Sequence, residues 1–118
     1  MLRLLILADD FTGALDTGVR FAARGIPTQV VTAEGFADVP EQTEVLVIDT
    51  ETRHLSPEEA SNRIYALTLS AIQAGISCIY KKTDSALRGN VGAELAAVLR
   101  ASTVERLSFL PAFPQIGR

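Results

Sequence analysis

The sequence predicts an α/β fold with three layers, in which helices cover both faces of a mainly parallel five-stranded sheet, as in flavodoxin-like and Rossmann-like domains. Short apolar runs alternate along the 118 residues with longer segments of helical periodicity. These runs are apolar at almost every position, which is typical of strands buried on both faces of a parallel sheet. Hydrophobic residues make up 47% of the chain and charged residues 21%, which is the composition of a globular domain.

The first strand is expected at residues 2–8, LRLLILA, and the first helix at residues 13–24. One face of this helix carries Leu15, Val19 and Ala22, the pattern of a face that packs on a core. A glycine and a proline follow the helix and are expected to end it.

Two further strands are expected at residues 28–33 and 44–49, with a helix after the second of them. Ser56 suits the N-cap of that helix, Pro57 its first position, and Glu59 completes a capping box. The apolar face of the helix is expected to comprise Ala60, Ile64, Leu67, Ala71 and Ala74, with Gly75 closing it.

The last three expected elements are a strand at residues 77–81, a helix at residues 89–100 and a fifth strand at residues 106–112. The inward face of the helix is expected to carry Val91, Leu95 and Val98. Strands that alternate with helices are joined by right-handed crossovers, so their carboxyl ends lie along one edge of the sheet.

Carboxylates, cations and hydroxyls are dense just after four of the five expected strands. Ligands of open parallel sheets bind at this edge, so we expect one shared site for a small anion there. The candidate site residues are Asp9, Asp10, Asp49, Arg53, Lys82, Asp84, Ser85, Arg88, Gly89 and Asn90.

The basic residues suggest how an anion would be held. Guanidinium groups bind carboxylates bidentately, which favours Arg53 and Arg88 as carboxylate ligands. Lys81 and Lys82 point to opposite faces if the strand continues through them, so only one can face a given pocket. Gly89 and Asn90 open a helix whose free N–H groups favour anions, although the glycines there equally suit a simple turn.

Asp9 and Asp10 allow three interpretations: metal ligands, a general base, or a helix cap beside a surface charge. We expect no metal site, since the single histidine, His54, has no histidine or cysteine partner and is expected at the surface. Dinucleotide-binding and P-loop motifs are absent, so the sequence offers no nucleotide site of those types.

Charge and composition exclude several partners. The net charge of −3 argues against general nucleic-acid binding. No apolar stretch reaches membrane-spanning length, and the start MLRLLILADD lacks a signal-peptide cleavage pattern. The single cysteine excludes an internal disulfide, and a cytoplasmic location is expected.

A response-regulator receiver domain is one alternative, because its acidic pocket and phosphoacceptor would fall on ADD and on Asp49. That family has a lysine before a proline in its fifth strand, and FLPAFP has Ala112 instead. A phospho-receiver-like signalling domain is therefore the weaker interpretation, and a non-catalytic effector or binding module is a further alternative.

The segments LADDFTGALDTG, VIDTETR, YKKTDSALRGNVGAEL and PAFPQIGR together resemble the four-carbon acid sugar kinase family, some members of which are described as type III effector-related. The resemblance covers almost the whole chain and keeps the order of the motifs. The sequence departs from the family at Ala86, usually threonine there, and at Phe11, often leucine there.

The resemblance implies that residues 1–118 are the N-terminal part of the sugar-acid-binding domain of an ATP-dependent kinase acting on threonate, erythronate or 3-oxo-tetronate. A C-terminal domain outside this chain would bind ATP and Mg²⁺, so neither is expected on these residues and the fragment alone is expected to be inactive. The implied partners are a small anionic sugar acid and that C-terminal domain, without nucleic acid or membrane, and a homo-oligomer remains open.

The same resemblance distributes roles among the candidate residues. The acid's carboxylate would meet Arg53, Lys82 and Arg88, while Asp10, Ser85 and Asn90 would bond its hydroxyls. Phosphoryl transfer also requires a base near the accepting hydroxyl. Asp10 and Asp84 are the expected catalytic residues, ahead of Asp9.

Overall fold

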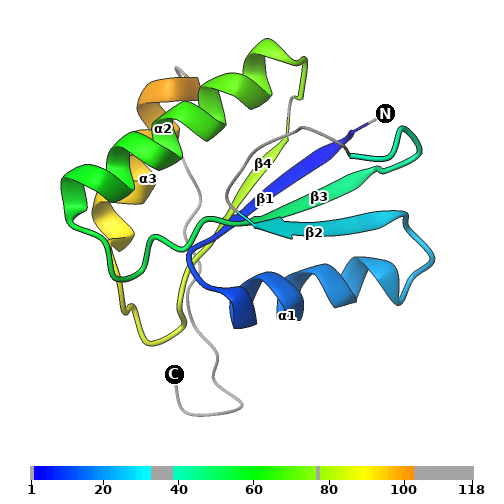
Figure 1. The fold of residues 1–118 in the computed structure, drawn as a ribbon, viewed down its shortest axis with the longest axis horizontal. Coiled ribbons are helices and arrows are strands. Elements are labelled where there is room, and N and C mark those ends of the chain that lie inside the picture. Colours follow the sequence, from blue (N-terminus) through cyan, green and yellow to red (C-terminus); the bar gives the residue numbers. More distant parts are fainter. Residues whose placement is uncertain (1, 33–38, 77, 103–118) are drawn as a thin grey trace.

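A computed structural model describes residues 2–32, 39–76 and 78–102, in which helices lie on both sides of a parallel sheet (Figure 1). The strands are β1 (Leu4–Ala8), β2 (Thr28–Thr32), β3 (Val45–Asp49) and β4 (Ile79–Lys82), and the helices are α1 (Phe11–Ala22), α2 (Pro57–Gln73) and α3 (Val91–Ser102). The predicted alternation of strands and helices is confirmed for these seven elements. The predicted fifth strand at residues 106–112 lies outside the described residues.

The order of the four described strands is β2-β3-β1-β4, and all of the pairs are parallel. Flavodoxin-like sheets begin in the order 2-1-3 and Rossmann sheets in the order 3-2-1. Here β3 lies between β1 and β2, so the α/β class with a parallel sheet is confirmed, whereas the flavodoxin-like or Rossmann-like type is not.

Each face of the sheet has its own core. Leu5 and Leu7 of β1 pack with α2 and α3, while Ile6 and Ala8 pack with α1. In Figure 1, α2 and α3 lie together on one side of the strands and α1 lies on the other. Because both faces of β1 and β3 are covered, their side chains from Leu5 to Ala8 and from Val45 to Asp49 are buried, which explains the continuous apolar runs.

The predicted inward face of α1 is wrong. Ala14 and Gly18 are buried against the sheet, whereas Leu15 is 45% exposed and Val19 is 59% exposed. A Cβ added at Gly18 would lie 2.9 Å from Val30 Cγ2, so the helix sits close to the sheet along its small residues. The close packing of α1 on the sheet therefore determines which face of the helix is buried, and the apolar periodicity of its sequence does not.

Helix α2 begins as predicted, because the Ser56 side chain caps it by accepting from the Glu59 backbone N–H at 3.1 Å. The predicted core residues of α2 are buried except Ala74, which lies just past its end. In α3 the prediction holds for Val98, whereas Leu95 and Val91 are half-buried and Glu94 is buried.

No helix within residues 2–32, 39–76 and 78–102 combines the length and the apolar character needed to cross a bilayer.

Candidate functional site

The carboxyl ends of β1 and β4 lie at the edge where parallel α/β sheets bind their ligands. The two strands are neighbours, and the chain leaves β1 for α1 on one face and β4 for α3 on the other. Connections that diverge to opposite faces leave a crevice between the strand ends. Asp49, Ala8 and Lys82 are in register across this edge.

Arg53, from the loop after β3, links three of the predicted carboxylates. It forms two hydrogen bonds with Asp9, from Nε to Oδ2 at 3.2 Å and from Nη2 to Oδ1 at 3.1 Å. Its Nη1 lies 3.0 Å from Asp10 Oδ2, and its Nη2 lies 3.8 Å from Asp84 Oδ1. Burial alone would lower the pKa of Arg53, but its bonds to Asp9 and the three acidic charges raise it. The guanidinium therefore neutralises the carboxylates and fixes them relative to one another.

Asp84 is held in the same manner by Arg88. The Arg88 Nε and Nη2 donate to the two Asp84 oxygens at 2.8 and 2.9 Å, and the backbone N–H groups of Ala86 and Arg88 donate at 3.2 Å. The hydrogen bonds from Arg88 hold the pKa of Asp84 well below its usual range, although burial acts in the opposite direction. Asp84 is thus an ionised anchor for the loop that enters α3.

Gly89 and Asn90 bring that loop against the loop after β3. Gly89 has a φ of 90°, and a Cβ there would lie 2.8 Å from Asp9 Oδ2 and 3.2 Å from Arg53 Cγ. Asn90 Nδ2 donates to the backbone oxygens of Thr52 and Leu55 at 3.2 and 2.8 Å. Glycine at position 89 is required both by the backbone conformation and by the close contact.

The two adjacent lysines do point to opposite faces. Lys81 Nζ lies 3.2 Å from Glu94 Oε1 of α3, and the two side chains are 3% and 2% exposed. Lys82 lies on the α1 side, where a Cβ added at Gly13 would be 3.9 Å from its Nζ. Lys82 Nζ donates to the Thr83 carbonyl at 2.6 Å and makes no ion pair with a carboxylate of the described residues.

Glu94 of α3 is connected through two threonine hydroxyl groups to the loop after β3 and to the end of β1. Thr52 donates to Glu94 Oε1 at 3.0 Å and lies 2.8 Å from the Thr50 hydroxyl, which donates to the Ala8 carbonyl at 2.9 Å. Burial raises the pKa of Glu94, while the Lys81 charge lowers it. The sequence analysis missed Glu94, although its position between the inward residues Val91 and Val98 was a signal.

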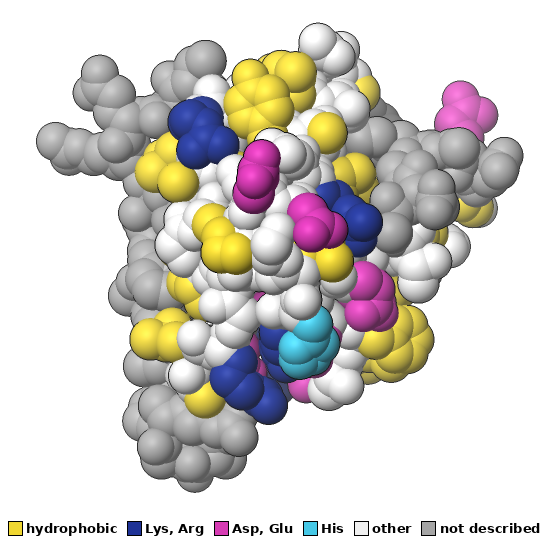
Figure 2. Space-filling view, turned by 60° about the vertical axis from the view of Figure 1, so that its left-hand side comes forward, with side chains coloured by type: hydrophobic (Ala, Val, Ile, Leu, Met, Phe, Trp, Pro, Cys, Tyr) yellow, Lys and Arg dark blue, Asp and Glu magenta, His cyan; other side chains and the backbone are white. Residues whose placement is uncertain are grey.

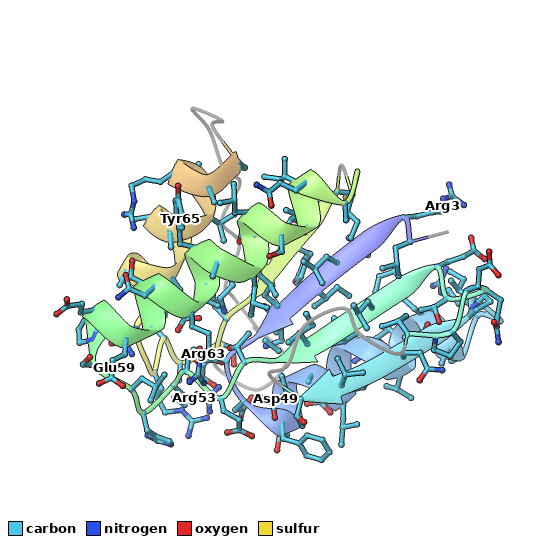
Figure 3. The ribbon with its side chains drawn as sticks, turned by 45° about the horizontal axis from the view of Figure 1, so that its top comes forward. Arg3, Asp49, Arg53, Glu59, Arg63 and Tyr65 are labelled. Carbon is cyan, nitrogen blue, oxygen red and sulfur yellow. The ribbon has the colours of Figure 1, made fainter. Side chains whose placement is uncertain are left out.

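Asp49 stands apart from the arginine-linked carboxylates. Its Oδ1 accepts the Glu51 N–H at 3.1 Å, and its Oδ2 is buried without a hydrogen-bond partner among the described residues. Burial raises the pKa of Asp49 to about 6, and the nearby Glu51 carboxylate raises it as well. Figure 3 shows Asp49, Arg53 and Arg63 at the site end of the sheet and Arg3 at the opposite end.

The structure therefore joins Asp9, Asp10, Arg53, Asp84 and Arg88 into one ionic cluster, with Gly89 against it. Ser85 is half-buried in the same loop, and Ala86 is exposed, so its methyl group faces solvent. His54 is exposed as predicted, and Figure 2 shows basic and acidic side chains gathered beside the histidine.

A magnesium ion does not fit the described residues. They contain no group of three or more histidine, cysteine, aspartate or glutamate side chains arranged to hold a metal. Both oxygens of Asp9 and of Asp84 are already bonded to arginine or backbone donors. The site is instead suited to an uncharged hydroxyl or a small carboxylate placed among fixed, opposite charges.

These observations define a parallel α/β domain with a polar cluster at the carboxyl ends of its strands, the edge at which such sheets bind their ligands. The profile of a family described as "Sugar-binding N-terminal domain" matches residues 4–118, so the chain belongs to that family.

Three curated relatives are kinases of four-carbon acids. The chain is 37% identical over 118 residues to a D-threonate kinase of Salmonella typhimurium, covering 99% of this chain and 28% of that protein. It is 33% identical to a D-erythronate kinase of Heliobacterium modesticaldum and to a 3-oxo-tetronate kinase of Escherichia coli, covering all of this chain and 28% and 31% of those proteins. These relatives confirm the resemblance to four-carbon acid sugar kinases, and the chain spans less than a third of their length.

A solved structure has the same fold. It is a crystal structure of a domain of unknown function from Bordetella bronchiseptica, described as a domain-swapped dimer with bound citrate. Its sequence is 35% identical and the TM-score is 0.75, over 85% of this chain and 26% of that one.

Proposed function

We propose that this chain is the sugar-acid-binding part of a longer ATP-dependent kinase that phosphorylates a four-carbon sugar acid: threonate, erythronate or 3-oxo-tetronate. Support comes from the family match and from relatives that phosphorylate these three acids. The domain boundary, residues 1–118 as the N-terminal part of the binding domain, is part of this proposal.

The position of Lys82 carries the proposal. Its ammonium group lies beside the first turn of α1, where backbone N–H groups also favour an anion, and it has no carboxylate partner among the described residues. Arg53 and Arg88 are committed to Asp9 and Asp84, so Lys82 is the better ligand for the acid's carboxylate. Citrate, found with the Bordetella relative, also combines carboxylates with a hydroxyl.

The remaining predicted residues then have supporting roles. Asp10 and Ser85 are proposed to bond substrate hydroxyls, whereas Arg53, Arg88 and Asn90 are proposed to hold the two loops in position. ATP and Mg²⁺ are proposed to bind to a part of the longer protein outside these residues. A cytoplasmic location and self-association remain proposals of the same kind.

The receiver-domain alternative is less favoured by the structure. Receiver sheets have the order 2-1-3-4-5, whereas β3 separates β1 from β2 here.

The test is ADP release by the full-length protein in the presence of ATP, Mg²⁺ and each of the three acids. We expect turnover with at least one of them and a phosphorylated acid as product. Absence of turnover with all three, by protein that is folded and binds ATP, would refute the proposed function.

A further inference from the structure

Three of the four aspartates at this edge already have a hydrogen-bond or ion-pair partner at each carboxylate oxygen. Both Asp9 oxygens accept from Arg53, and both Asp84 oxygens accept from Arg88. Asp10 Oδ1 caps α1 by accepting the Gly13 N–H at 2.9 Å, and its Oδ2 lies 3.0 Å from Arg53 Nη1. For Asp84, the hydrogen bonds from Arg88 also lower the pKa, which makes this carboxylate a weak base.

Asp49 is different, because it is fully buried and its Oδ2 has no hydrogen-bond partner among the described residues. A buried oxygen without a hydrogen bond destabilises the folded state, so such an oxygen in a native structure is a candidate for a functional role. The same turn carries a second sign of strain. Glu51, whose N–H bonds the other Asp49 oxygen, has a φ of 51°, a left-handed conformation unusual for a residue with a side chain.

The position of Asp49 relative to Lys82 matches a short hydroxy acid. Both residues are in register with Ala8, on either side of it and on the sheet face that α1 covers. Two strand spacings put their Cα atoms about 10 Å apart. In this row of the sheet, the side chain that β1 places between Asp49 and Lys82 is the methyl group of Ala8. An acid with its carboxylate at Lys82 would therefore extend its hydroxyl-bearing chain toward Asp49.

We propose, on the basis of the proposed kinase function, that Asp49 is the proton acceptor for the hydroxyl that becomes phosphorylated, in place of Asp10 or Asp84. The hydroxyl proton passes to Asp49 Oδ2 as the hydroxyl oxygen forms its bond to the γ-phosphorus of the nucleoside triphosphate. The bond from that phosphorus to the bridging oxygen breaks, and the nucleoside diphosphate leaves with the electron pair. Asp49 loses the proton to water that enters the site when the phosphorylated product leaves.

Asp49 has no exposed surface, so the substrate must displace neighbouring atoms to reach it, and water is kept away from the same oxygen. The charged groups that shift the pKa of Asp49 are Glu51 in the following turn and Asp10 at the start of α1. Lys82 lies in the same row of the sheet, on the other side of Ala8. Burial is the main cause that raises the pKa of Asp49 to about 6, and the Glu51 and Asp10 carboxylates contribute to the rise. The base is then ionised above this pH, so turnover should rise as the pH increases through it.

The experiment compares Asp49→Asn and Glu51→Gln in the full-length protein, with Asp16→Asn on the exposed side of α1 as the matched control. Asp49→Asn should lower kcat at least about 100-fold with KM for the acid changed only a few-fold, and should abolish the acidic limb of the kcat profile. Its Tm should not fall, because the substitution removes a buried charge. Glu51→Gln should move the acidic limb to lower pH, and the control should leave kcat and the limb unchanged.

A kcat of Asp49→Asn within about threefold of the wild type, or an acidic limb that survives in it, would overturn the assignment. If Asp49→Asn does not fold, Glu51→Gln decides, and an unmoved limb counts against Asp49. Failure of the proposed function gives a different result, namely no turnover by the wild-type protein with any of the three acids.

Discussion

Gly89 shows how closely single residues fit at the strand-end site. Its φ of 90° and the 2.8 Å from an added Cβ to Asp9 Oδ2 both oppose any side chain. Gly89→Ala should lower the free energy of unfolding by about 1–3 kcal/mol, measured by urea denaturation followed by circular dichroism.

Gly92 provides the matched control, since it lies in α3 and an added Cβ would meet nothing within 4 Å. Gly92→Ala should be neutral or raise the free energy of unfolding by up to about 1 kcal/mol. Equal losses at the two positions would contradict the close contact at Gly89.

Because of Asp84, the free energy of unfolding is expected to fall as the pH is lowered into the acidic range. Its pKa in the folded chain is lowered by Arg88, so its contribution is fully present above the unfolded-state value of about 3.9. The contribution is lost progressively as the pH falls from that value through the lowered pKa of the folded state. Asp84→Asn should therefore cost about 1–3 kcal/mol at pH 7 and less near pH 2, as measured by urea titrations at the two values. A loss that is the same at both would mean that the ion pair with Arg88 adds no stability.

At the scale of the elements, the buried pair of Lys81 and Glu94 ties β4 to α3. Removing one partner leaves a buried charge, so Lys81→Met or Glu94→Leu alone should destabilise by about 3–5 kcal/mol. The double variant should recover most of that loss, because it leaves no unpaired charge. Thermal unfolding of the four proteins measures the coupling, and losses that simply add would show that the pair does not interact.

The sequence predicted the elements better than it predicted how they face one another. Continuous apolar runs such as LLILA identified the strands, and Ser56 and Pro57 identified the start of α2. The orientation of α1 was missed because the closeness of a helix to its sheet depends on small residues such as Gly18, which hydrophobic periodicity ignores. The strand order also depends on long-range pairing that no local pattern specifies.

Over the whole molecule, the position of the site followed from the alternation of strands and helices. Parallel strands bring their carboxyl ends to one edge, and Asp9, Asp10, Arg53 and Asp84 lie together there. Which charges pair was not predictable, because Arg53 reaches Asp9 across 44 positions and only the folded chain sets that distance. Pairing decides which groups are left for a ligand, and it separates Lys82 and Asp49 from the arginine-linked cluster.

The central claim is that this edge binds a four-carbon sugar acid through Lys82. Isothermal titration of D-threonate, D-erythronate and 3-oxo-tetronate into the full-length protein tests it most directly, with Lys82→Met compared with Arg20→Met, an exposed residue of α1. We predict binding of at least one acid, a loss of about tenfold or more in affinity for Lys82→Met, and no change for Arg20→Met. Equal affinities of wild type and Lys82→Met, with both proteins folded, would contradict the account.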